Sequence, residues 1–178
     1  LPVNANAKSL VNLFASCKLL TDLSDIEGWN VSHITSFYNV FNGCSSLTKL
    51  DLSNWSTDSA TTMQGMFQSC TSLTEIKGIE NFNVSKVTNF GSMFYNCLSL
   101  TKLDLRNWVT SSATTFQDMF STCHNLEVIR VDNFDTSKVN TGTGLNAMFS
   151  HCKKVKTLNL NSFVNPGLGN FLHFCNNC

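Results

Sequence analysis

The chain has 178 residues, with 12 basic and 12 acidic side chains, so its formal net charge is zero. Charged residues make up 13% of it, about half of the usual quarter, which argues against a nucleic-acid-binding protein with its basic face. No apolar run approaches the roughly 18 residues of a membrane-spanning helix, and the length fits one domain.

The sequence repeats about every 26 residues, and cysteines mark the repeat. Successive cysteines of one series are 26 to 29 residues apart, and only Cys175 lies outside it. The series is Cys17, Cys44, Cys70, Cys97, Cys123, Cys152 and Cys178. Such a period is typical of a solenoid, in which each repeat buries its apolar face against its neighbours. We therefore expect one domain over 1–178, with a lead-in over 1–9 and coils over 10–178.

The residues before each cysteine predict a helix. In the third repeat Met63, Met66 and Phe67 precede Cys70 by seven, four and three positions, and apolar residues at these spacings lie on one helical face. Polar residues twelve positions before a cysteine are expected to be N-caps. These are Ser32, Asp58, Ser85 and Ser111.

The residues after each cysteine predict a short strand. In the second repeat Leu47, Leu50 and Leu52 are followed by Trp55, and the alternation of Leu50 and Leu52 has the period of a strand. One strand and one helix per repeat predict an α/β solenoid of about seven coils with parallel strands. Two repeats carry one extra residue before the aromatic, Trp29 or Phe82, which indicates duplication of a 53-residue, two-coil unit.

The segment Leu47-x-x-Leu50-x-Leu52-x-x-Trp55 resembles the leucine-rich-repeat core LxxLxLxxN, with an aromatic residue in place of the final Asn. The full unit, MFxxCxSLTxLDLSxWxTSxxTxM, is similar to the BspA-like family of leucine-rich repeats, which includes repeats of mycoplasma lipoproteins and other bacterial surface proteins. The resemblance covers essentially residues 10–178. It implies a leucine-rich-repeat-type α/β solenoid on the cell surface or secreted, with a role in adhesion or partner binding and no catalysis.

Charged residues of alternating sign follow the predicted strand face. They are Asp22, Lys49, Asp51, Glu75, Lys77, Lys102, Asp104 and Arg130. Residues two apart on a strand share a face, so stacked coils would form a checkerboard of opposite charges. One interpretation is pairing that fixes the register of the coils, worth roughly 0.2–1 kcal/mol per pair. The other is a polar ligand-binding face, and we favour the first because the charges satisfy one another.

The cysteine series is interpreted as a ladder of small buried side chains, since free cysteine packs like a small hydrophobe. Cys175 and Cys178 form a lone CxxC, which is weak evidence for zinc and leaves a disulfide possible. The four histidines lie at different repeat positions. We therefore expect no metal, no cofactor and no catalytic residue.

Three Asn-x-Ser sequences, at Asn30, Asn54 and Asn83, are candidate glycosylation sites if the protein passes through a eukaryotic secretory pathway, and are otherwise chance products of the composition. Two functions remain open. One is a surface or secreted module that recognises a protein or glycan ligand. The other is a structural subunit whose coils associate end to end into an extracellular filament, which the absence of recognisable polar caps favours.

Overall fold

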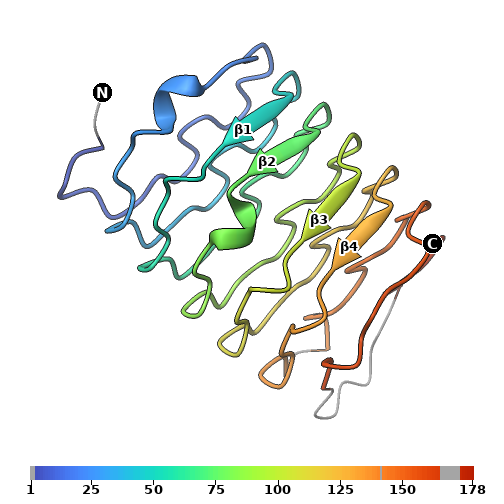
Figure 1. Cartoon of the computed structure of the whole chain (residues 1–178). Coiled ribbons are helices and arrows are strands. Elements are labelled where there is room, and N and C mark those ends of the chain that lie inside the picture. Colours follow the sequence, from blue (N-terminus) through green and yellow to red (C-terminus); the bar gives the residue numbers. More distant parts are fainter. Residues whose placement is uncertain (1–2, 141, 165–172) are drawn as a thin grey trace.

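The computed structural model describes residues 3–140, 142–164 and 173–178. The chain winds into one coil per repeat, and the coils stack so that the two termini lie at opposite ends (Figure 1). Backbone bridges join equivalent residues of neighbouring repeats, as in the parallel series Ser36, Thr62, Asn89 and Thr115. The repeat period therefore sets which residues become neighbours.

The described residues form four strands of three residues on one side of the stack (Figure 1): β1 (Lys49–Asp51), β2 (Glu75–Lys77), β3 (Lys102–Asp104) and β4 (Val128–Arg130). We call this side, over residues 20–24, 47–52, 73–77, 100–105 and 126–131, the strand wall. Strand β1 pairs with β2 and strand β3 with β4, both in parallel, whereas β2 and β3 do not pair. The wall is thus divided into two strand pairs.

Both repeats with an extra residue contain a 3₁₀ turn after the strand segment. These turns are η1 (Ser24–Ile26) and η2 (Ile79–Asn81). Gly78 precedes η2 with a φ of 86°, a left-handed conformation that glycine adopts without strain. An added Cβ would lie 2.5 Å from the Ser53 Cα, so the coil requires glycine for close approach as well.

The predicted helix in each coil is wrong. The described residues contain no α-helix, and the segments before the cysteines form a turn wall, residues 10–17, 37–44, 63–70, 90–97, 116–123 and 145–152. In this wall alternate amides bond to the next coil, as when Phe41 donates to the Met66 carbonyl oxygen at 2.9 Å. The described part of the chain is mostly irregular with two short strand pairs, and the expected α/β solenoid with a helix per coil does not form.

Two tight turns replace each helix for a physical reason. The amides of Val40 and Cys44 donate to the carbonyl oxygens of Phe37 and Phe41, three residues earlier, and the third residue of each turn has positive φ, as in a type II turn. Helices pack about 8–10 Å apart, but paired strands lie about 4.8 Å apart. Turns that bond to the next coil let both walls keep the narrower spacing.

The sequence carried a signal for these turns at the positions five and one before each cysteine. Polar or small residues and glycine occupy them, and such residues tolerate left-handed backbone best. The left-handed residues of the turn wall and its C-terminal continuation are Asn12, Ser16, Asn39, Gly43, Gly65, Ser69, Ser92, Asn96, Asp118, Thr122, Ala147, His151, His173 and Asn177.

The predicted N-cap residues lie in turns instead of at helix ends. The Ser32 and Ser85 amides donate to the side-chain oxygens of Asn30 and Asn83, at 3.1 and 3.2 Å. Asp58 and Ser111 likewise precede no α-helix. Their short polar side chains therefore serve local turns, a common alternative for residues of this type.

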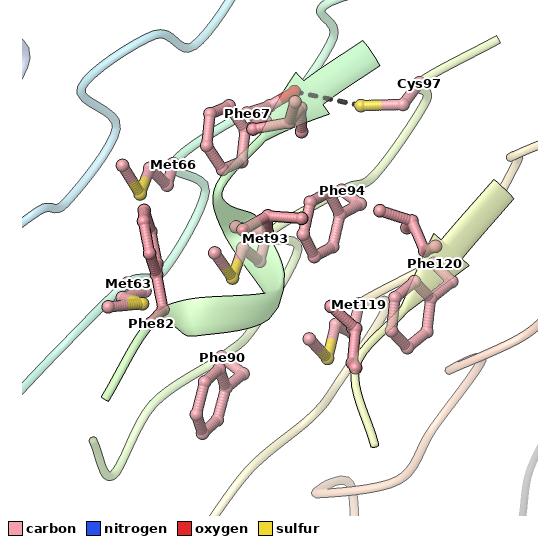
Figure 2. Close-up of a cluster of buried hydrophobic side chains, with 14 of the residues drawn as sticks. Met63, Met66, Phe67, Phe82, Phe90, Met93, Phe94, Cys97, Met119 and Phe120 are labelled. Atoms are coloured by element: carbon pink, nitrogen blue, oxygen red, sulfur yellow. Dashed lines mark hydrogen bonds between the residues drawn. The ribbon is translucent and has the colours of Figure 1, made fainter. Parts of the chain in front are cut away.

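The core consists of columns of identical side chains that run along the stack (Figure 2). Phe41, Phe67, Phe94 and Phe120 stack with centroids 5.5 to 5.6 Å apart, and methionines lie beside them. No helix in the described residues is long and apolar enough to cross a membrane.

Candidate functional site

A depression of about 620 Å³ lies on the strand wall between β2 and β3. It forms where these strands share no backbone pairing, and η2 lies beside it. Buried Ile76 and Leu103 contribute to its lining. Its charged lining residues are Lys49, Glu75, Lys77, Glu80, Lys102, Asp104 and Arg106. A second depression of about 230 Å³ lies beside η1 and β1.

The first strand pair neutralises its own charges. Lys49 Nζ lies 3.3 Å from the Glu75 carboxylate, and Lys77 Nζ bonds to Asp51. The bond from Lys77, with help from Ser53, lowers the pKa of Asp51 to about 2. Exposed ion pairs of this kind contribute little to the free energy of unfolding, so they set register more than stability.

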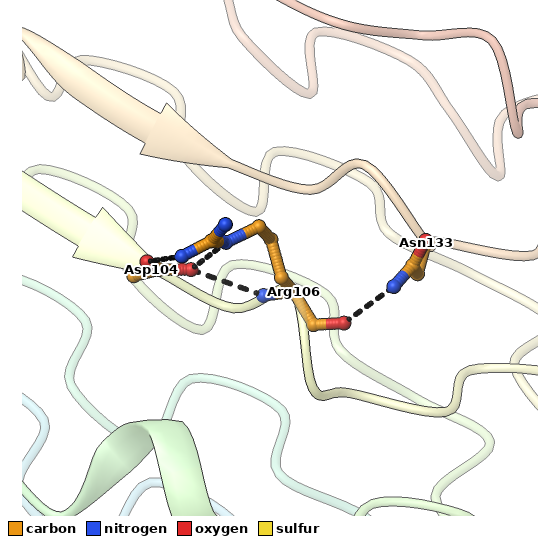
Figure 3. Close-up of polar contacts among 3 residues, drawn as sticks. All are labelled: Asp104, Arg106 and Asn133. Carbon is orange, nitrogen blue, oxygen red and sulfur yellow. Dashed lines mark hydrogen bonds and ion pairs between the residues drawn. The ribbon is translucent and has the colours of Figure 1, made fainter.

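The second strand pair has a different arrangement (Figure 3). Arg106 donates from Nε and Nη2 to the two Asp104 oxygens at 2.9 and 2.8 Å, and Asn133 Nδ2 donates to the Arg106 carbonyl oxygen at 2.9 Å. The bonds from Arg106 hold the pKa of Asp104 below its usual value. Asp104 lies opposite Arg130 in the strand register, but its charge is taken up within its own coil.

The predicted checkerboard is therefore present in part. The structure brings Lys49 to Glu75 and Asp51 to Lys77, whereas Lys102 lies opposite Val128. Within the described residues neither Lys102 nor Arg130 has a carboxylate within 4.0 Å. Asp22 accepts bonds from the amide and hydroxyl of Ser24 at 3.0 and 3.2 Å.

Sequence reasoning missed two charged residues that line the depression, Glu80 and Arg106. Arg106 could have been found, because it stands two residues after Asp104, and side chains at that spacing on extended backbone lie on the same side. Glu80 lies in η2, a turn that the leucine pattern does not predict, so its place at the depression could not be found from that pattern.

Each cysteine of the ladder from Cys17 to Cys152 is the last residue of its turn-wall segment. Cys97 Sγ donates to the Phe67 carbonyl oxygen of the preceding coil at 3.1 Å (Figure 2), and Cys44, Cys70, Cys123, Cys152 and Cys178 repeat this contact. All eight cysteines are free, and Cys17, Cys175 and Cys178 are exposed. Burial raises the pKa of Cys44 to about 11 and of Cys123 to about 12.

No group of three or more His, Cys, Asp or Glu side chains in the described residues is placed to hold a metal ion. The sequon residues Asn30, Asn54 and Asn83 are exposed in the loops between strand wall and turn wall. The Asn30 and Asn83 side chains bond to neighbouring serines, and Asn83 Nδ2 also donates to Asp58 at 2.7 Å.

The family model described as a Mycoplasma protein of unknown function, DUF285, matches residues 8–128 and, in an overlapping second match, residues 98–171. The chain belongs to the DUF285 family. A comparison with curated proteins finds no match. The DUF285 description names no activity, so the function of this member has to be argued from its surfaces.

Proposed function

We propose that this DUF285 member is a non-catalytic recognition protein, on the cell surface or secreted, that binds a protein or glycan partner through its strand wall. The observation that carries the proposal is the depression between β2 and β3, whose lining combines charged residues with Ile76, Ile79 and Leu103. Binding sites typically combine apolar lining with a few placed polar groups.

Two further observations support this proposal. Coils joined along both walls and filled by stacked aromatic rings form a preorganised surface, and preorganisation lowers the entropic cost of binding. The repeat unit also resembles BspA-like repeats of bacterial surface proteins. That resemblance favours a role outside the cell and in adhesion.

The test is an array of immobilised peptides and glycans probed with the labelled chain. Lys102 and Glu80 line the depression and are exposed, and neither forms an ion pair within the described residues. We expect Lys102→Ala with Glu80→Ala to reduce binding of any array ligand at least about tenfold. Lys138→Ala, at an exposed loop position, is the matched control and should leave binding unchanged. An array profile that is the same for both variants and the wild type would contradict the proposal.

End-to-end association into a filament is a second candidate, favoured by the hydrogen bonding of the turn wall. In the described part of the chain the carbonyl oxygens of Val11, Leu13 and Ala15 accept no hydrogen bond, whereas their equivalents in the next coil do. In the turn wall each coil within the stack offers amide donors to the following coil and carbonyl acceptors to the preceding one, and this polarity suits a head-to-tail contact between copies.

Negative-stain electron microscopy with light scattering tests this second candidate. Filaments with a regular axial repeat would support it. A monomer of about 19.7 kDa that remains monomeric at high concentration would exclude it and leave recognition through the strand wall.

A further inference from the structure

The second strand pair is an altered copy of the first, displaced by one 53-residue unit. Lys49 and Asp51 of β1 correspond to Lys102 and Asp104 of β3, and Lys77 of β2 corresponds to Arg130 of β4. The position of Glu75, however, is taken by Val128, whose side chain is 40% exposed. The copy therefore keeps the lysine and lacks its carboxylate.

A second difference frees another cation. In the first pair Ser53 donates its amide to Asp51 at 3.0 Å and leaves the carboxylate free to bond Lys77. The corresponding position in the copy is Arg106, which holds both Asp104 oxygens. Arg130 thereby loses the partner that Lys77 has.

Lys102 and Arg130 are thus two exposed, unpaired cations on adjacent strands, with exposed Val128 opposite Lys102. The next coil adds Lys153, Lys154 and Lys156, which are exposed and form no ion pair in the described structure. Glu127, next to Val128, is an exposed acidic residue. Glu75, which already pairs with Lys49, shares the depression with Lys102, and Asp132 stands two residues after Arg130. The cations of this region still outnumber its carboxylates, and such a field attracts acidic partners.

We infer that the β3–β4 pair binds an acidic peptide segment in extended conformation, whose carboxylates meet Lys102 and Arg130. This assignment rests on the proposed recognition function, names its ligand class, and extends the site from the depression, which Lys102 lines, onto β4. The first strand pair shows how such a ligand would be recognised. There Lys49 and Lys77, which correspond to Lys102 and Arg130, pair with the carboxylates of Glu75 and Asp51 on extended backbone. Two acidic side chains separated by one residue lie on the same face of an extended peptide, so both can face the wall.

The probe is the capped peptide Thr-Glu-Val-Glu-Thr, titrated into the whole ¹⁵N-labelled chain at low salt, with Thr-Gln-Val-Gln-Thr as the uncharged control. We expect saturable amide shifts confined to β3, β4 and their flanking loops, and at least about tenfold weaker binding of the control. Salt should weaken the complex, since the charges are exposed. Equal binding of a single-stranded oligothymidylate would indicate a nonspecific basic patch and overturn the peptide assignment.

Variants that exchange the residues by which the two strand pairs differ give the sharpest test. Val128→Glu with Arg106→Ser recreates the self-neutralised first pair, and we expect at least about tenfold loss of peptide binding. Val128→Gln adds a side chain of similar size without charge and should change binding less than about threefold. In the opposite direction, Glu75→Val with Ser53→Arg should free Lys49 and Lys77 and raise the stoichiometry from one peptide to two.

The outcomes separate this inference from the proposed function. If the acidic peptide does not bind the wild type but array binding still depends on Lys102 and Glu80, the ligand class is wrong and recognition through the strand wall stands. If neither the peptide titration nor the array binding depends on residues of the strand wall, the ligand class and the proposed recognition function are both wrong. A gain of a second site in the Glu75→Val, Ser53→Arg variant cannot arise from misfolding and would support the inference directly.

Discussion

The indole Nε1 of Trp108 donates a 3.0 Å hydrogen bond to the carbonyl oxygen of Ile79 in the preceding coil. Trp55 makes the same contact with Ile26, also at 3.0 Å. Trp29 lies one coil earlier, and its buried Nε1 has no partner among the described residues. The same residue type is therefore satisfied inside the stack and unsatisfied in the first coil.

This difference predicts unequal effects of the same substitution. Trp108→Phe removes a buried hydrogen bond as well as apolar surface, whereas Trp29→Phe removes an unsatisfied donor. Because a lost buried bond costs about 1–3 kcal/mol, we expect Trp108→Phe to be the more destabilising by about that amount. Urea unfolding followed by circular dichroism measures both free energies of unfolding. Equal losses for the two variants would show that the indole bond contributes nothing.

The turn wall predicts a stabilising substitution at Thr122. Thr122 has a φ of 66°, which is strained for a β-branched residue. Asparagine tolerates this conformation better, so we expect Thr122→Asn to raise the free energy of unfolding by about 1 kcal/mol. Thr157→Asn is the control, because Thr157 is exposed, has no positive φ and makes no side-chain hydrogen bond in the described structure. A destabilised Thr122→Asn protein would argue against the left-handed turn at this position.

The sequence identifies which side chains are buried better than it identifies the backbone that buries them. Met66, Phe67 and Cys70 are fully buried, as their spacing predicts. The same spacing fits a helix and a pair of tight turns, because both point these positions inward. The distinguishing residues are Asn39 and Gly65, which destabilise a helix interior and favour positive φ.

The charged wall shows a similar limit. Alternating signs predict which residues lie near each other, and Lys49 and Glu75 do pair. They do not predict that Arg106, in the same coil as Asp104, bonds to the Asp104 carboxylate in place of Arg130, which lies opposite it. That outcome depends on side-chain reach, which the one-dimensional pattern does not contain.

The lowered pKa of Asp51 predicts that the free energy of unfolding depends on pH in acid. Its pKa falls from 3.8 to about 2 in the folded protein, chiefly because Lys77 bonds to the carboxylate. The unfolded chain therefore binds more protons between these values, and stability should fall as the pH drops from about 4 to 2. Asp51→Asn should reduce that slope, as measured by urea midpoints at pH 5 and pH 2.5. Asp25→Asn, at an exposed position without an ion pair, should leave the slope unchanged.

The cysteines predict two classes of thiol reactivity. Cys17, Cys175 and Cys178 are exposed, while Cys44, Cys70, Cys97, Cys123 and Cys152 are buried. The thiolate is the reactive form, and burial raises the pKa of Cys44 to about 11 and of Cys123 to about 12. We expect the three exposed thiols to react with a disulfide reagent in the native protein, with Cys175 slowed because burial raises its pKa to about 11, and the five buried thiols to react only on unfolding. Fewer than eight thiols after unfolding without reductant would reveal a disulfide.

The close backbone approach at Gly78, beside the depression between β2 and β3, predicts that a side chain at this position destabilises the protein. Its φ of 86° and the 2.5 Å that would separate an added Cβ from the Ser53 Cα leave no room for a side chain. Since left-handed strain costs about 1–3 kcal/mol and a backbone clash adds to it, Gly78→Ala should destabilise the chain by about 2 kcal/mol or more. Gly28→Ala is the matched control, because nothing lies within 4 Å of its added Cβ, and it should change stability by less than about 0.5 kcal/mol. Thermal unfolding of the two variants compares them directly, and a Gly78→Ala protein as stable as Gly28→Ala would mean that η2 does not pack on Ser53 as described.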